Sequence, residues 1–208
     1  MKLVLLIAFL TLAQASTPSG DEILARAGAA ENLTSFSVPV HFNVHMKRPI
    51  GVRSQVEGVV YYRSPASAAL VLTKVPPPIG SFFKGPYQLA LAPQVWPSQY
   101  TITTVTGGAS DAAHTLVLIG VPKVDDPSID HVEVVVAQAD YSPLAITWFY
   151  RDKSTIHLTM ETQRLSGAAL PRSESIEVNM PQYGLEATAT YGDYSFNVPL
   201  PEGAFRHQ

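Results

Sequence analysis

The feature that most constrains this chain is a strict alternation of apolar and polar residues from Phe36 to Met46. Every even position is apolar, and the odd positions hold Ser, Pro, His or Asn. Because neighbouring residues on a strand point to opposite faces, the pattern predicts a strand with one dry face and one wet face. The residues expected on the dry face are Phe36, Val38, Val40, Phe42 and Val44.

Strand-like segments follow one another along most of the remaining chain, and short turn signals such as Gly107-Gly108 and Asp152-Lys153 separate some of them. The pattern therefore predicts a mainly β protein with a single antiparallel sheet of about ten or eleven strands. The further segments are Val52 to Tyr62, Ala68 to Lys74, Tyr87 to Ala92, Gln99 to Thr106, His114 to Val121, Ile129 to Ala137, Leu144 to Arg151, Ser154 to Glu161, Ser175 to Met180 and Leu185 to Tyr191.

Only the segment at 19–33 has a strong helical pattern. Ser19 or Asp21 can cap it, acidic residues occupy its first turn, and a narrow apolar stripe runs through Ile23, Ala27 and Ala30. One short helix is about 10 Å across, so it covers only a small part of so wide a dry face. We therefore expect the sheet to curl into an incompletely closed barrel around an apolar cavity.

The stretch "GVVYYRSP" places apolar side chains on both faces of one strand, because the neighbours Tyr61 and Tyr62 cannot share a face. One of the two tyrosines is expected to point into the cavity and the other to lie under the helix or a loop. The proline-rich connection from Val75 to Tyr87 carries Phe82 and Phe83. We expect this loop to close the cavity mouth beside the helix, as a lid.

The first 15 residues have the organisation of a secretory signal peptide. Lys2 precedes an apolar run from Leu3 to Ala13, and Ala13 and Ala15 form a cleavage site. The run is much shorter than the roughly 20 residues that a membrane-spanning helix needs. We expect a soluble, periplasmic or otherwise exported protein whose mature single domain is 16–208.

Composition narrows the function further. The chain has 17 acidic and 14 basic residues, so a phosphate backbone is not the expected partner and we predict no nucleic-acid binding. Apolar residues make up 46% of the chain, whereas cysteine is absent. The fold must therefore be stabilised by its core rather than by disulfides, and the chain cannot be a lipid-anchored lipoprotein.

Catalytic and metal motifs are weak. His41 and His45 lie too far apart on a strand to share an ion, and the aspartates in "KVDDPSID" lack the spacing of a calcium loop. Ser110 and Asp111 are not set in a nucleophile elbow, and no phosphate loop or dinucleotide fingerprint is present. We therefore predict no catalytic residues, no cofactor and no metal. Trp96 and Trp148 fit either a packed core or a cavity wall.

The order of several short motifs resembles the LolA-like periplasmic lipoprotein-carrier family and its wider superfamily of lipid-binding half-barrels. After the N-terminal helix these motifs are "NLTSFSVPVHFNV", "GVVYYRSP", "HTLVLIGVP" and "YSFNVPLPEGAF". Lipoprotein carriers of this kind have an arginine directly before the proline of an "RP" motif. Here that position is Ser64 and Arg63 comes one residue earlier, which turns the arginine to the other side of the strand.

The resemblance implies an open antiparallel barrel, lidded by helices, whose cavity holds acyl chains. Its partners would be a lipid or an acylated lipoprotein, together with an envelope membrane protein that donates or accepts the ligand. An envelope sensor or protein-interaction module on the same scaffold, and a hydrolase, stay open as alternatives. The residues expected to line the cavity and its lid are Phe36, Val38, Val40, Phe42, Val44, Tyr62, Leu70, Leu72, Phe82, Phe83, Trp96, Leu116, Leu118 and Trp148.

Overall fold

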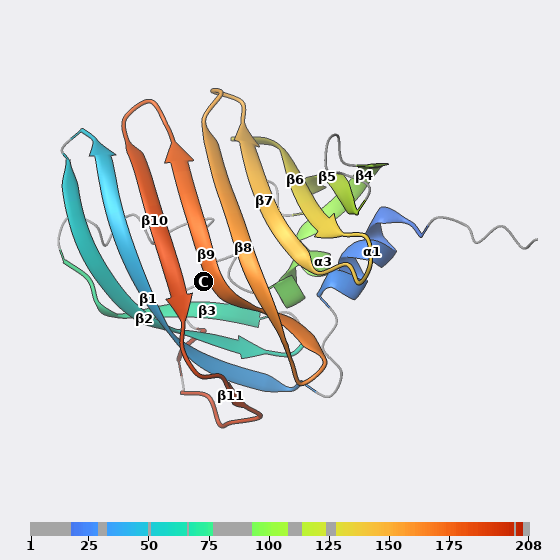
Figure 1. The fold of residues 1–208 in the computed structure, drawn as a ribbon, viewed down its shortest axis with the longest axis horizontal. Helices are drawn as coiled ribbons and strands as arrows, with labels where there is room; N and C mark the ends of the chain where they lie inside the picture. Colours follow the sequence, from blue (N-terminus) through green and yellow to red (C-terminus); the bar gives the residue numbers. More distant parts are fainter. Residues whose placement is uncertain are drawn as a thin grey trace, which may run out of the picture.

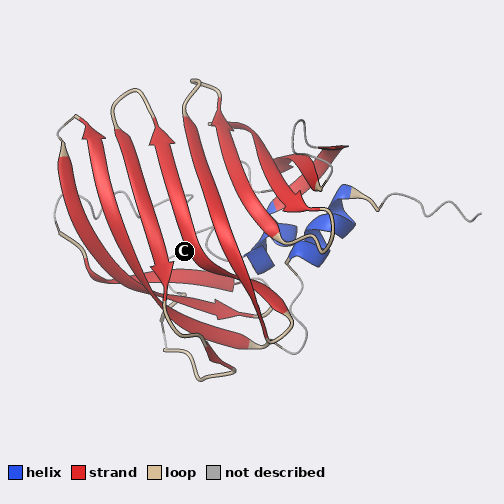
Figure 2. Ribbon diagram, viewed as in Figure 1, coloured by secondary structure: helices blue, strands red, loops and turns tan. Residues whose placement is uncertain are grey.

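The computed structural model describes residues 18–28, 33–49, 51–65, 67–76, 93–107, 114–123, 128–201 and 203–205. Their architecture is an 11-stranded antiparallel sheet with short helical segments at one end (Figures 1 and 2). The helical segments are α1 (Gly20–Ala27), η2 (Pro93–Val95) and α3 (Trp96–Gln99). The strands are β1 (Ser35–Arg48), β2 (Val52–Arg63), β3 (Ser67–Lys74), β4 (Tyr100–Gly107), β5 (Thr115–Pro122), β6 (Ile129–Ala137), β7 (Pro143–Tyr150), β8 (Thr155–Leu165), β9 (Ala168–Asn179), β10 (Gly184–Tyr191) and β11 (Ser195–Phe196).

The strand order is β3-β2-β1-β10-β9-β8-β7-β6-β5-β4, with the short β11 paired to the start of β1. Strands β3 and β4 end the sheet, and no pairing between described residues joins them. The lower parts of β1, β2 and β3 bend away from the plane of the other strands, so the sheet is strongly curled (Figure 1). The predicted incomplete antiparallel barrel is confirmed.

Ten of the predicted strand segments correspond to β1 to β10. The segment Tyr87 to Ala92 lies outside the described residues. Two details differ from the prediction: β9 begins at Ala168 rather than near Ser175, and the two-residue β11 was not predicted. β11 forms because the chain, after β10, returns along the same edge of β1 and pairs Phe196 with Phe36.

Burial along β1 follows the predicted alternation. Phe36, Val38, Val40, Phe42 and Val44 are all buried, whereas Pro39 and Asn43 are exposed. On β2 the residues opposite this row include Tyr62, Val60 and Val56, and these are buried as well. The two long strands therefore contribute one continuous dry surface to the interior.

The two adjacent tyrosines separate as their positions on β2 require. Tyr62 points inward, is 3% exposed, and stacks on Phe36 with 5.0 Å between the ring centroids. Tyr61 is half-buried on the opposite, outer face. The stacked pair joins the start of β1 to the end of β2.

Gly58 allows β3 to approach β2 closely. A Cβ at this position would lie 2.9 Å from the carbonyl oxygen of Val71. The pairing of β2 with β3 also shifts between Glu57 and Gly58, which adds a local irregularity where the sheet curls. Leu70 of β3 consequently joins the buried core from the edge of the sheet.

Helix α1 starts at a capping box. The backbone N–H of Glu22 donates to the Ser19 hydroxyl, and the Ser19 N–H donates to the Glu22 carboxylate. The helix ends at Ala27 with Gly28 as its C-cap, and a Cβ on Gly28 would meet the Pro93 carbonyl oxygen at 2.7 Å. This close approach packs α1 against η2 and α3, and its buried Ile23 and Ala27 fit the predicted stripe. Ala30, the last residue of that stripe, lies outside the described residues.

The two faces of β1 make a direct test of the fold. Val40→Asp places an unpaired carboxylate in the buried row, and we expect it to lower the free energy of unfolding by several kcal/mol or to prevent folding. Asn43→Asp adds the same charge to the exposed face of the same strand and should change stability by about 0.5 kcal/mol or less. Urea denaturation checks both variants, and equal losses would contradict the assignment of faces.

Candidate functional site

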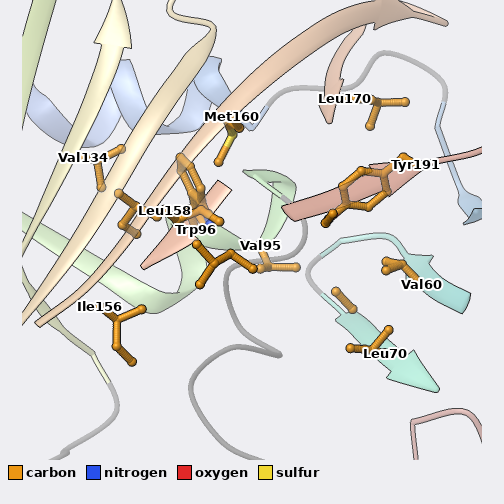
Figure 3. Close-up of a cluster of buried hydrophobic side chains, with 14 of the residues drawn as sticks. Val60, Leu70, Val95, Trp96, Val134, Ile156, Leu158, Met160, Leu170 and Tyr191 are labelled. Atoms are coloured by element: carbon orange, nitrogen blue, oxygen red, sulfur yellow. The ribbon is translucent and has the colours of Figure 1, made fainter. Parts of the chain in front are cut away.

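The interior of the curled sheet is the candidate site. Figure 3 shows labelled apolar side chains of β2, β3, β6, β8, β9 and β10 and of the η2–α3 segment facing a common interior. In this view Tyr191 lies between Leu170 and Val60, and Trp96 lies beside Leu158. All of these side chains belong to one contiguous core cluster. Strands that are far apart in the sheet thus contribute to the same apolar space.

The structure places the described members of the predicted site in this interior. Leu72 and Leu116 are partly buried at its margin. Phe82 and Phe83, together with most of the expected lid, lie outside the described residues. The remaining predicted residues are buried members of the core cluster: Phe36, Val38, Val40, Phe42, Val44, Tyr62, Leu70, Trp96, Leu118 and Trp148.

The two tryptophans lie at the helical end of the interior. Trp148 of β7 donates from its indole Nε1–H to the Tyr100 hydroxyl at 3.0 Å, which satisfies a polar group that burial would otherwise leave without a partner. Burial raises the pKa of Tyr100, so this hydroxyl stays protonated. Trp96 of α3 is fully buried, and its Nε1 has no hydrogen-bond partner.

Glu174 is a buried acidic residue of the interior that was not predicted from the sequence. It is 4% exposed and lies in the inward row of β9, two residues before Ile176, which is buried in the same row. Its cross-strand neighbours are Met160 on β8 and Ala189 on β10. The predicted strand began at Ser175, one residue after Glu174, so the inward position of this carboxyl was not recognised. The alternation of Glu174, Ile176 and Val178 is the signal that could have revealed it.

A hydrogen bond from Tyr191 holds the Glu174 carboxyl. The Tyr191 hydroxyl donates to Oε2 at 2.8 Å, whereas Oε1 is buried without a hydrogen-bond partner. Burial raises the pKa of Glu174 from its ordinary value of 4.5 to about 8, although the hydrogen bond from Tyr191 opposes part of that rise. The carboxyl is therefore mainly neutral at pH 7.

Two tyrosines surround this carboxyl. Burial raises the pKa of Tyr191 and of Tyr194, and the nearby Glu174 raises both further. The Tyr194 hydroxyl donates to the Pro171 carbonyl at 2.7 Å, and its ring lies 5.4 Å from that of Phe36. The resulting neutral, hydrogen-bonded group links β9 and β10 to the inward end of β1.

Arg63 lies outside this interior. It is exposed, and its guanidinium lies 4.6 Å from the ring centroid of Phe205 near the C-terminus. This cation–π contact fastens the C-terminal segment to the end of β2. Ser64, at the position of the family arginine, is exposed, and the Tyr62 hydroxyl bonds to the neighbouring Pro65 carbonyl at 3.3 Å.

The outer face of the sheet also carries grooves. One of about 620 Å³ lies over β1 and β2, where Asn43, His45, Arg53 and Gln55 are among its lining residues. In the described part of the chain, no three His, Cys, Asp or Glu residues are grouped closely enough to hold a metal ion. None of the described helices is long and apolar enough to cross a membrane.

The open, curled antiparallel sheet with helical segments at one end defines a half-barrel class of proteins, and solved structures share it. A LolA superfamily protein from Nitrosomonas europaea superposes with a TM-score of 0.66 at 14% identity, covering 91% of this chain and 98% of its own. A DUF1329 family protein from Desulfovibrio piger gives 0.62 at 11% identity, with coverages of 90% and 96%. A Vibrio parahaemolyticus domain named for outer membrane lipoprotein sorting gives 0.62 at 14% identity, with coverages of 89% and 95%.

These likenesses extend over almost the whole chain, and the protein has a LolA-like fold. At such low identity the similarity concerns the fold. No protein-family model matches the chain, and no curated protein matches it.

The buried carboxyl predicts a specific pH dependence. Between about pH 4.5 and pH 8 the folded protein keeps a proton on Glu174 that the unfolded chain releases, so the free energy of unfolding falls as the pH rises. The fall is about 1.4 kcal/mol per pH unit within this window. Glu174→Gln should remove that contribution, which urea denaturation at several pH values measures. Parallel pH profiles for the variant and the wild type would contradict the assignment of a raised pKa.

Proposed function

We propose that this protein is an exported, non-enzymatic carrier that binds a lipid or an acylated molecule inside the half-barrel. The observation that carries the proposal is the breadth of the apolar inner face compared with the helical segments beside it. Inward rows on β1, β6, β8 and β10 are apolar and buried. In contrast, α1 and α3 mainly contact β4, η2 and each other.

Such an interior suits an acyl chain. Each methylene removed from water contributes about 0.8 kcal/mol, so a long chain is held tightly by apolar walls without strong polar contacts. The wall residues come from many strands of a curled sheet, and a flexible chain can follow such a surface. The LolA-like fold supports this interpretation because the similar Vibrio domain is named for lipoprotein sorting.

A carrier of this kind would also need export, a cover for its interior and a partner in the envelope. Residues 1–15 would direct export, and the mature protein would work in the periplasm. Phe82 and Phe83 would cover the mouth of the interior. An envelope membrane protein would donate the ligand or accept it.

Small residues on β10 provide the test. Ala187 is buried in the inward row, between Val44 of β1 and Ile176 of β9, whereas its neighbour Thr188 is exposed on the outer face. Ala187→Phe should occupy ligand space and weaken the uptake of a fluorescent fatty-acyl probe about tenfold or more. Thr188→Phe adds the same ring to the outside of the same strand and should leave uptake unchanged.

The stability of Ala187→Phe completes this test. If the interior receives a ligand, the added ring fills existing space and the urea midpoint should change little. A tightly packed core would instead lose about 1 to 3 kcal/mol through overpacking. Wild-type protein that takes up no acyl probe, together with such a loss, would contradict the carrier function and favour a protein-interaction module.

A further inference from the structure

Glu174 stands out because it puts a carboxyl group on an apolar wall. Among the described residues it is the only buried side chain of a charged residue type. The inward positions beside it on β8 and β10 are Met160 and Ala189, which offer no hydrogen bond to it. Because Ala189 ends at its Cβ, it leaves more volume beside the carboxyl than a larger residue would.

The two oxygens of this carboxyl have different roles. Oε2 accepts the hydrogen bond from the Tyr191 hydroxyl at 2.8 Å, and this contact fixes the orientation of the group. Oε1 has no partner although it is buried. Leaving a buried polar atom without a hydrogen-bond partner is energetically unfavourable. A ligand that bonds to Oε1 would offset this cost.

We propose that Glu174, oriented by Tyr191, is the polar anchor of the interior and binds the carbonyl oxygen of an acyl ester or acyl amide. The proposal rests on the carrier function and adds the chemical class of the ligand. With Oε2 accepting from Tyr191, the acid proton resides on Oε1 and is donated to the ligand carbonyl. The surrounding apolar walls hold the hydrocarbon chain. The protonation this requires agrees with the raised pKa, about 8, of the carboxyl.

A pair of matched ligands tests this contact. Monopalmitoylglycerol and 1-O-hexadecylglycerol have the same headgroup and the same chain length, and they differ at the carbonyl. We expect the wild type to bind the ester about tenfold more tightly than the ether, measured by displacement of a fluorescent acyl probe at pH 6.5. N-palmitoylethanolamine extends the series to an amide carbonyl, and its affinity relative to the ester shows which acyl linkage the site prefers.

Variants of the anchor should remove this discrimination selectively. Glu174→Leu should bring the ester-to-ether ratio to about one while ether binding stays the same or becomes tighter. Glu174→Gln can still donate from its amide and should keep part of the preference. Tyr191→Phe keeps the ring but removes the orienting hydroxyl, so it should lower the ratio several-fold. This variant carries the test if Glu174→Leu does not fold.

The outcomes separate the two proposals. A wild type that binds both ligands equally, or a Glu174→Leu variant that keeps the full ester preference, overturns the anchor while the carrier function stands. A wild type that binds neither ligand nor the probe overturns both. Loss of the preference in Glu174→Leu and Tyr191→Phe with ether binding retained supports the anchor, because a merely structural carboxyl would not distinguish two ligands that differ at one carbonyl.

Discussion

The width of one dry sheet face governs the architecture of this protein. Period-two alternation on long strands gives the sheet an apolar surface that α1 and α3, with 8 and 4 residues, cannot cover. Curling the sheet lets inward rows on distant strands face the same interior, as Leu70 of β3 and Val134 of β6 do (Figure 3). The sheet does not close into a full barrel, since its end strands β3 and β4 do not pair through described residues. The interior therefore belongs to a half-barrel.

Alternation made the fold predictable from the sequence. A strand with one buried face requires apolar residues at every second position, and β1 shows this from Phe36 to Val44 without interruption. Turn residues then bounded most strands to within a few positions. The start of β9 was harder to predict because its first residues, Ala168 to Pro171, are buried in succession and carry no period. β11 is too short to have a pattern of its own.

The site was predictable only in part. The burial of the apolar interior residues follows from the same alternation, so it was predicted along with the strands. Glu174 was not, because a glutamate at the border of a strand is usually solvated, and its burial depends on how β8, β9 and β10 pair. Arg63 illustrates the converse case, since its position one residue before Ser64 correctly placed it away from the interior, while its contact with Phe205 depends on the tertiary fold.

The central claim is that the interior of the half-barrel is an acyl-binding site, and the contents of the purified protein test it most directly. Protein isolated from its native envelope without detergent should yield acyl lipids or acylated peptides in an organic extract, close to one per chain by mass spectrometry. Ala187→Phe, prepared in the same way, should yield much less, and Thr188→Phe as much as the wild type. An extract with no acyl compound, from a wild type that also fails to take up added acyl ligand, would contradict the account.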